Sequence, residues 1–356
     1  MNEISALKVG CGKFFYGKGV LEQLAPEIFR LGGRAFVIGG VHTLPLFLKH
    51  VNTMLEDSNI FYYTETFHGE CTAEKAQKYA DLANTGGYSV FVAIGGGKCI
   101  DQVKCASVFS GLPIITVPTS IATCVATSMV AIMYNDLGQR APAVNLKKEV
   151  DVCIADRDLI ASAPERTLSA GILDSLAKYP ESVHQKKGYT YKDCNLKEYI
   201  QMINAKGIYD FLINEYSNIY QKNKECELFD DFILTNLLHT SIVSGFADGS
   251  GQLAIAHATY DFMRNHNTKN AASFLHGEIV GVGLILQMYF NEMPKEEINR
   301  IRNSMKEMQM PCNFRDLNYA ESKENISLFL DIVCSECSIT SAGEKSKLEK
   351  VLNEIL

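Results

Sequence analysis

The sequence lacks three features that would each point to a large class of proteins. No apolar run approaches the ~20 residues that a helix needs to cross a bilayer. No secretory signal segment opens the chain. No block of basic residues opposes the net charge of −7 and the isoelectric point near 5.7. We therefore expect neither a membrane nor a nucleic acid as partner, and a small molecule as the ligand.

A disulfide framework is not indicated either. The eleven cysteines are scattered along the chain, and the pair Cys334 and Cys337 has no second pair or histidine spacing that would complete a zinc ribbon. Reduced thiols in a cytoplasmic protein are the expected state. With 356 residues, of which 47% are apolar, the chain can bury a large core, and we expect two domains.

A glycine-rich stretch between two apolar runs is the first candidate site. The run Ser89–Ile94 ends in Gly95-Gly96-Gly97 and Lys98, a helical pattern follows, and a second apolar run spans Leu112–Val117. Glycines let the backbone amides approach a phosphate, and a helix start adds its positive dipole end. The stretch is neither GxGxxG nor GxxxxGK[ST], so a plain connector between strand and helix is the alternative.

Strand and helix patterns alternate through the first half of the chain. We expect strands at 7–15, 34–38, 60–66, 128–134 and 151–156, and helices at 17–31, 43–55 and 72–84, the last opened by Thr72 as N-cap. This alternation predicts a doubly wound parallel sheet. Beyond Pro164 the pattern is helical almost throughout. The predicted fold is an α/β domain over residues 1–160 followed by an all-helical domain over 161–356.

The helical half contains the second candidate site. Asp174 lies among apolar and small residues, where a helix face would ordinarily be uncharged, and two further helical patterns contain His257 and His276. One carboxylate and two imidazoles can form a three-ligand metal site with an open position. Satisfied core histidines are the alternative. Five other residues compete as ligands but are expected to be solvated or capping: His184, His239, His266, Glu181 and Asp261.

The motifs together resemble a known family. They are GGGKxxD from Gly95 to Asp101, PTS from Pro118, AGxxDxLAK from Ala170 to Lys178, and the two helical histidines. In this order they resemble the iron-containing (group III) alcohol dehydrogenase superfamily, and within it the glycerol-dehydrogenase-like branch. The resemblance implies an N-terminal dinucleotide-binding domain, a C-terminal helical metal-binding domain, and a nicotinamide in the cleft between them.

The resemblance also implies roles for individual residues. Asp174, His257 and His276 match the ligands of one divalent metal, zinc or iron. The implied cofactor is NAD or NADP, and its implied contacts are Gly95, Gly96, Gly97, Lys98, Asp101, Thr119, Ala122, Ser128, Val130 and Tyr134. No catalytic side chain is implied beyond the metal site, because the proton of the alcohol can pass to water. Family members commonly associate, so we expect a homo-oligomer.

Three departures from the family pattern bear on specificity. Gly40 stands where many NAD-using relatives carry an acidic residue, which opens the possibility of NADP(H). Cys124 stands at the substrate position, where glycerol dehydrogenases place an aspartate that binds the polyol, and this argues against glycerol. Where the family has the motif HAxH, this chain has His257-Ala-Thr-Tyr260, so a tyrosine replaces the second histidine. Where the family has two aromatic residues followed by Glu, residues 179–181 are Tyr-Pro-Glu.

The sequence therefore predicts a metal-dependent NAD(P)(H) oxidoreductase. It would transfer hydride between the nicotinamide and the carbinol or carbonyl carbon of a small polyol, alcohol, or hydroxy or oxo acid. One alternative is an enzyme like 3-dehydroquinate synthase or glycerol-1-phosphate dehydrogenase, although the helical half has no arginine-rich cluster for a phosphorylated substrate. An alternative of another class is a catalytically degenerate nucleotide-binding protein.

Overall fold

The protein is described by a computed structural model that covers residues 7–186, 190–221, 227–247 and 254–356. The chain forms two compact units. The first runs to Pro164 and includes the later segment that begins at Phe229. The second comprises Glu165–Leu228 and the remainder of the chain to Leu356. The assignment of residues 1–160 to dinucleotide binding and of 161–356 to metal binding stays a prediction.

The first unit is built on a six-stranded sheet in which every neighbouring pair is parallel. Its order is β1-β8-β5-β4-β2-β3. The strands are β1 (Cys11–Gly17), β2 (Arg34–Gly40), β3 (Phe61–Phe67), β4 (Val90–Gly95), β5 (Ile114–Pro118) and β8 (Val150–Asp156). All residues of β4 are buried. This explains its unbroken apolar run, because a central strand of a parallel sheet is covered on both faces.

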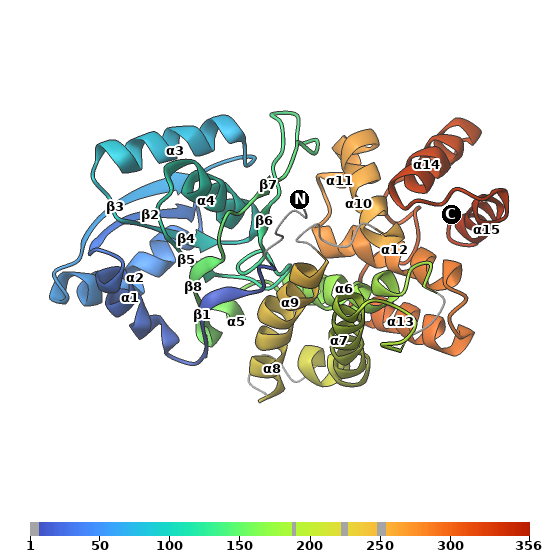
Figure 1. Ribbon diagram of the computed structural model, residues 1–356, viewed down its shortest axis with the longest axis horizontal. Helices are drawn as coiled ribbons and strands as arrows, with labels where there is room; N and C mark the ends of the chain where they lie inside the picture. The colour runs from blue at the N-terminus through green and yellow to red at the C-terminus, as the bar shows by residue number, and fades with distance from the viewer. Residues whose placement is uncertain (1–6, 187–189, 222–226, 248–253) are drawn as a thin grey trace. The chain divides into compact units, whose positions relative to one another are not determined.

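Helices cover both faces of this sheet. They are α1 (Leu24–Arg30), α2 (Thr43–Asp57), α3 (Ala73–Thr85) and α4 (Gly97–Ser110). Figure 1 shows α1 and α2 on one face and α3 and α4 on the other. The predicted N-cap of α3 is confirmed, because the Thr72 hydroxyl accepts a hydrogen bond from the Lys75 amide. The expected doubly wound parallel sheet is confirmed as well.

The direction of winding reverses between β2 and β4. Strand β3 lies on the outer side of β2, whereas β5 and β8 follow on the far side of β4. At this point the ends of β2 and β4 are adjacent, with Gly39 in register with Ile94. Ligands of doubly wound sheets bind outside the carboxyl ends of the strands at such a reversal. The glycine-rich turn after β4 lies at this position.

Smaller elements complete the first unit. They are η1 (Val20–Gln23), β6 (Val130–Ala131), β7 (Val144–Asn145), α5 (Arg157–Ala161), α8 (Leu228–Leu234), the π-helical turn η3 (Thr235–His239) and α9 (Thr240–Phe246). Helix α8 begins at Leu228, which belongs to the second unit, and its other residues belong to the first unit.

Three sequence-based boundaries were wrong. The first strand starts at Cys11, because Gly10 has φ +71° and interrupts an extended chain. The helical pattern of 17–31 gives only η1 and α1, because Gly17 and Gly19 also have positive φ. The expected strand 128–134 shrinks to the two residues of β6 and an isolated bridge between Tyr134 and Arg140.

Among the described residues of the second unit, the regular elements are helices, as expected. Its helices are α6 (Glu165–Ser182), α7 (Leu196–Gln221), α10 (Ile255–His266), α11 (Thr268–Ala271), α12 (His276–Phe290), α13 (Lys295–Glu307), α14 (Lys323–Glu336) and α15 (Ala342–Asn353). Helices α6, α10 and α12 pack on one another. In the described parts of the chain, no helix combines the length and apolarity that a membrane crossing requires.

Candidate metal centre and dinucleotide turn

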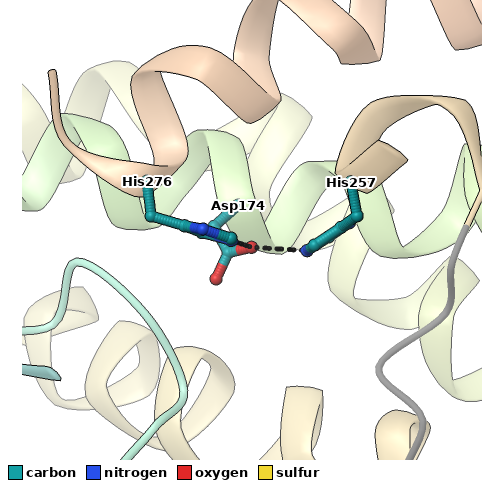
Figure 2. A group of neighbouring side chains, drawn as sticks. All are labelled: Asp174, His257 and His276. Atoms are coloured by element: carbon teal, nitrogen blue, oxygen red, sulfur yellow. Dashed lines mark ion pairs between the residues drawn. The ribbon is translucent and has the colours of Figure 1, made fainter. Parts of the chain in front are cut away.

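Three helices bring the predicted metal ligands together in the second unit. Asp174 lies in the middle of α6, His257 near the start of α10, and His276 is the first residue of α12. Their side chains converge, as Figure 2 shows. The Asp174 Oδ1 atom lies 3.3 Å from His257 Nε2 and 3.4 Å from His276 Nε2. One donor atom from each residue lies within 4.8 Å of the other two.

Glycines on α12 allow this convergence. A Cβ atom at Gly277 would lie 1.9 Å from the Ala170 carbonyl oxygen of α6. A Cβ atom at Gly283 would lie 2.7 Å from the Ala256 carbonyl oxygen of α10. These distances are too short for real Cβ contacts, so the two glycines permit backbone-to-backbone packing. Gly277, which follows His276 directly, thus places this histidine directly over α6.

We expect Gly277→Ala to destabilise the protein by about 1–3 kcal/mol, the usual cost of forcing extra volume into a packed interior. Because the obstacle is backbone, the start of α12 must shift and His276 with it. Urea unfolding measures the change in stability. Gly343→Ala is the matched control, because Gly343 lies in α15 with open space where the added methyl group would lie, and alanine there should stabilise the helix by about 0.5–1 kcal/mol. Equal stabilities of G277A and the wild type would contradict the account of this packing.

The triad has the chemistry of a divalent-metal site. The Asp174 side chain is only 3% exposed, and its Oδ1 atom is buried without a hydrogen-bond partner. A buried carboxylate oxygen that accepts no hydrogen bond is costly unless a cation compensates it, and the Lys178 ammonium, at 3.6 Å, lies beyond hydrogen-bond distance. One oxygen and two imidazole nitrogens form a three-ligand set that leaves a fourth position for substrate. The residues present therefore fit a catalytic divalent ion.

Glu181 was expected to be solvated or capping. It is not solvated, but it does cap a helix, because it accepts the His257 amide in the first turn of α10. Its side chain is fully buried and holds His257 with both carboxylate oxygens. Oε1 accepts the backbone amide of His257 at 2.9 Å, and Oε2 lies 2.6 Å from the ring Nδ1. This contact keeps a proton on Nδ1, so Nε2 is the ring nitrogen that faces Asp174 and that a metal would bind after Nε2 loses its own proton. Glu181 thus orients the imidazole that faces the triad.

Lys178 adds a positive charge beside the triad. Its side chain is 4% exposed, and its Nζ lies 3.4 Å from His257 Nε2 and 3.6 Å from Asp174 Oδ1. Burial alone would raise the pKa of Asp174, but the Lys178 ammonium and the two imidazoles hold it well below its usual range. Burial would lower the pKa of His257, yet the Glu181 carboxylate outweighs it and raises this pKa to about 9. Burial lowers the pKa of His276.

The competing ligands lie elsewhere. His184 contacts the Cys337 carbonyl and the Gln287 amide through its two ring nitrogens. His266 stacks on Phe262, and His239 belongs to the first unit. Among the described residues, the cluster of potential metal ligands is the predicted triad of Asp174, His257 and His276.

The glycine-rich turn joins β4 to α4 at the reversal of the sheet. Gly95 has φ +150°, and Gly96 is the N-cap of α4 without a side-chain cap. The first amides of α4 therefore face outward from the carboxyl end of β4, as a phosphate site requires. Lys98 forms an ion pair with Glu70 at 2.6 Å, and its ammonium lies 5.6 Å from the centre of the Tyr134 ring.

The remaining predicted cofactor positions lie in the same unit. The Thr119 amide donates to the Gly95 carbonyl, so the chain after β5 is joined to the turn. Asp101 is buried in α4, and its Oδ1 lies 3.0 Å from the Lys104 ammonium. Burial raises the pKa of Asp101, and the ammonium opposes the rise. The others lie on the chain between β5 and the Tyr134 bridge: Ala122, Cys124, Ser128 and Val130. Their cofactor and substrate roles stay predictions.

Sequence reasoning missed Lys104. It lies on the helix after the glycines and received no role from the sequence, although it is fully buried and contacts the segment that contains Ser128 and Val130. Its position three residues after Asp101 was the available signal, because oppositely charged residues at i and i+3 face each other on a helix.

Comparison with known proteins gives a consistent result. Residues 11–157 match the family model described as iron-containing alcohol dehydrogenase. The chain is 26% identical over 307 residues to a glycerol dehydrogenase of Thermotoga maritima, covering 86% of this chain and 83% of the relative. It is 28% identical over 274 residues to hydroxycarboxylate dehydrogenase A of Escherichia coli, covering 75% and 70%. The crystal structure of a probable glycerol dehydrogenase from Sinorhizobium meliloti shares the fold, with a TM-score of 0.80, 21% identity and coverage of 99% and 98%.

The first unit has a parallel sheet with a glycine turn where the winding reverses, and the second unit carries an Asp-His-His centre. Together with the family match, these features define an oxidoreductase of the alcohol dehydrogenase class. Together these matches support the iron-containing alcohol dehydrogenase superfamily, and within it the glycerol-dehydrogenase-like branch, as the family that the chain resembles. Its cofactors are a nicotinamide dinucleotide and a divalent metal, and its substrate is a small molecule.

Proposed function

We propose that this chain reduces small 2-oxo acids, and oxidises the corresponding hydroxy acids, with Asp174, His257 and His276 as the ligands of the metal. The observation that carries the metal assignment is the buried Asp174 oxygen without a hydrogen-bond partner, which lies beside two imidazole nitrogens. The glycine turn at the start of α4 is proposed to hold the pyrophosphate of NAD or NADP.

The residues around the metal have distinct tasks. When bound, the divalent ion supplies Lewis acidity, which polarises a carbonyl or stabilises the charge that develops on an alcohol oxygen during hydride transfer. Glu181 keeps Nε2 of His257 available by occupying Nδ1. Lys178 contributes a positive field within 4 Å of two ligand atoms. A proton at the reacting oxygen can be exchanged with water, so no side chain is assigned as a general base.

Two residues favour an anionic substrate over glycerol. Cys124 replaces the aspartate that binds the polyol in glycerol dehydrogenases, and a thiol is a weak hydrogen-bond partner for hydroxyl groups. Lys178 adds a charge that attracts a carboxylate next to the reacting carbonyl. The similarity to hydroxycarboxylate dehydrogenase A of Escherichia coli agrees with this substrate class.

The position at the end of β2, which would face the adenosine ribose of the cofactor, permits either NAD or NADP. Strand β2 ends in Gly40, so no carboxylate at that position repels a 2′-phosphate or binds the ribose hydroxyls. We therefore propose that NADPH and NADH are both accepted.

A substrate panel tests the proposed function. The purified protein is assayed for reduction of 2-oxobutyrate and dihydroxyacetone and for oxidation of glycerol, simple diols and glycerol 1-phosphate. Each assay is run with the appropriate form of NAD and of NADP, before and after chelation. We expect metal-dependent reduction of 2-oxobutyrate to be the fastest reaction. Turnover that survives removal of the metal, preference for the phosphorylated polyol, or no turnover of any carbonyl would each overturn the proposal.

The substitution Lys178→Met separates charge recognition from metal chemistry. We expect KM for 2-oxobutyrate to rise about tenfold or more, because the charge that attracts the carboxylate is lost. The uncharged dihydroxyacetone serves as the matched substrate, and its KM should change much less. Equal changes for both substrates would show that Lys178 does not recognise the carboxylate.

We also propose a cytoplasmic homo-oligomer. The described cysteines are free thiols, and most are buried, in agreement with a reducing compartment. Members of the family commonly form oligomers, and we therefore propose the same for this chain. Light scattering of the purified protein measures its oligomeric state.

A further inference from the structure

Lys104 is a fully buried lysine of α4 that binds an irregular segment of the chain. Its ammonium lies 2.9 Å from the Val125 carbonyl oxygen, 3.0 Å from the Ser128 hydroxyl and 2.5 Å from the Val130 carbonyl oxygen. Asp101, one turn earlier on α4, balances its charge at 3.0 Å. Three acceptor oxygens and one adjacent carboxylate thus compensate a charge that would otherwise be very costly to bury.

Other side chains hold the carbonyls between these contacts. The Thr116 hydroxyl of β5 donates to the Ala126 carbonyl at 2.8 Å, and the Ser241 hydroxyl of α9 donates to the Thr127 carbonyl at 2.8 Å. The Thr127 hydroxyl in turn donates to the Leu237 carbonyl of η3. The segment from Val125 to Val130 is therefore fixed by contacts with four different elements, α4, β5, α9 and η3, and pairing with β7 begins only at Val130.

The strand expected at 128–134 forms only in part beyond these contacts. Val130–Ala131 pairs with β7, while the carbonyls of residues 125–127 accept hydrogen bonds from side chains. An irregular segment fixed in this way has a single well-defined shape, which is the property of a binding loop that is organised before its ligand arrives.

We propose that Lys104 is a positioning residue that fixes the segment 124–130 as the surface against which the nicotinamide and the substrate are placed. The inference rests on the proposed function, because the family resemblance behind that function implies a substrate role for Cys124 and cofactor contacts for Ser128 and Val130. Lys104 itself is buried behind the segment and acts through it. Asp101 balances the charge of Lys104 from the same helix.

The test compares Lys104→Met with the double variant Lys104→Met/Asp101→Asn. The single variant leaves the buried Asp101 carboxylate without its lysine partner and is expected to lose stability, whereas the double variant removes both charges and keeps the fold. In the double variant we expect faster hydrogen exchange confined to residues 120–132. We also expect KM for the nicotinamide cofactor to rise about ten- to hundredfold, the cost of a small misplacement of binding groups. Metal content should stay at the wild-type level, because the triad belongs to the second unit.

Lys13→Met is the control, since it removes a different ion pair of the same unit, between Lys13 and Glu27 at 2.5 Å. Its exchange over 120–132 and its KM should match the wild type. Unchanged exchange and unchanged KM in the double variant would overturn the inference. A rise in KM of the same size in Asp101→Asn alone would also overturn it, by assigning the effect to Asp101. If the wild type turns over with neither nicotinamide, the proposed function fails, while the exchange measurement still decides whether Lys104 fixes the segment.

Discussion

Replacing Asp174 with asparagine is expected to lower kcat/KM by about three orders of magnitude and to remove the bound metal. Lewis-acid stabilisation by a metal ion is worth several kcal/mol, and each 1.4 kcal/mol corresponds to about a tenfold change in rate. Asparagine has nearly the same shape, so packing within α6 is kept while the negative charge is lost. Metal content by elemental analysis and steady-state kinetics measure the two effects on one preparation.

Glu165→Gln is the matched control for this prediction. Glu165 lies at the exposed start of the same helix and should retain metal and activity when neutralised. An Asp174→Asn enzyme that holds a full equivalent of metal would show that Asp174 is not a ligand. An enzyme without metal but with wild-type turnover would show that the metal is not catalytic.

Replacing Glu181 with glutamine is expected to weaken metal binding by about 10–100-fold, as the loss of a carboxylate behind a metal-bound histidine usually does. Glu181 accepts two hydrogen-bond donors from His257, the backbone amide and the ring Nδ1. A glutamine offers one acceptor oxygen, and the backbone amide cannot change its role as donor. The side-chain NH₂ group therefore faces Nδ1 and favours the tautomer with its proton on Nε2, which cannot bind a metal.

Competition with a chromophoric chelator measures this affinity directly, without reference to turnover. Glu27→Gln is the control, because Glu27 is also a buried carboxylate that binds two groups, Lys13 and Arg30, but in the first unit. It should bind metal like the wild type. If E181Q and E27Q both matched the wild type, Glu181 would have a structural role only.

The α/β half was predictable because its signals are local. The apolar run Ser89–Ile94 lies within one residue of β4, and Thr72 caps α3, since each pattern reports its own strand or helix. One exception has a local cause too, because positive φ at Gly10 delays the first strand. The strand expected at 128–134 pairs only at Val130–Ala131 and at the Tyr134 bridge, and no local pattern marks that limit.

The site was predictable only in part, because its geometry depends on contacts between distant residues. Asp174 was marked by its charge on an apolar helix face, and the two histidines by the resemblance to a family. Glu181 could not be recognised, because its partner His257 lies 76 positions away and no local pattern links them. Lys104 was hidden for a similar reason, since the carbonyls it binds are 21 and 26 positions further along the chain.

The most direct test of the central claim is a metal titration of the purified enzyme. The protein is stripped with a chelator, and zinc or iron(II) is added back in known amounts while reduction of 2-oxobutyrate is followed. The account predicts that activity disappears on stripping and returns in proportion to bound metal, with a break at about one ion per chain, and that the Asp174→Asn enzyme shows no recovery. Full activity of the stripped enzyme, or equal recovery of the Asp174→Asn enzyme, would contradict it.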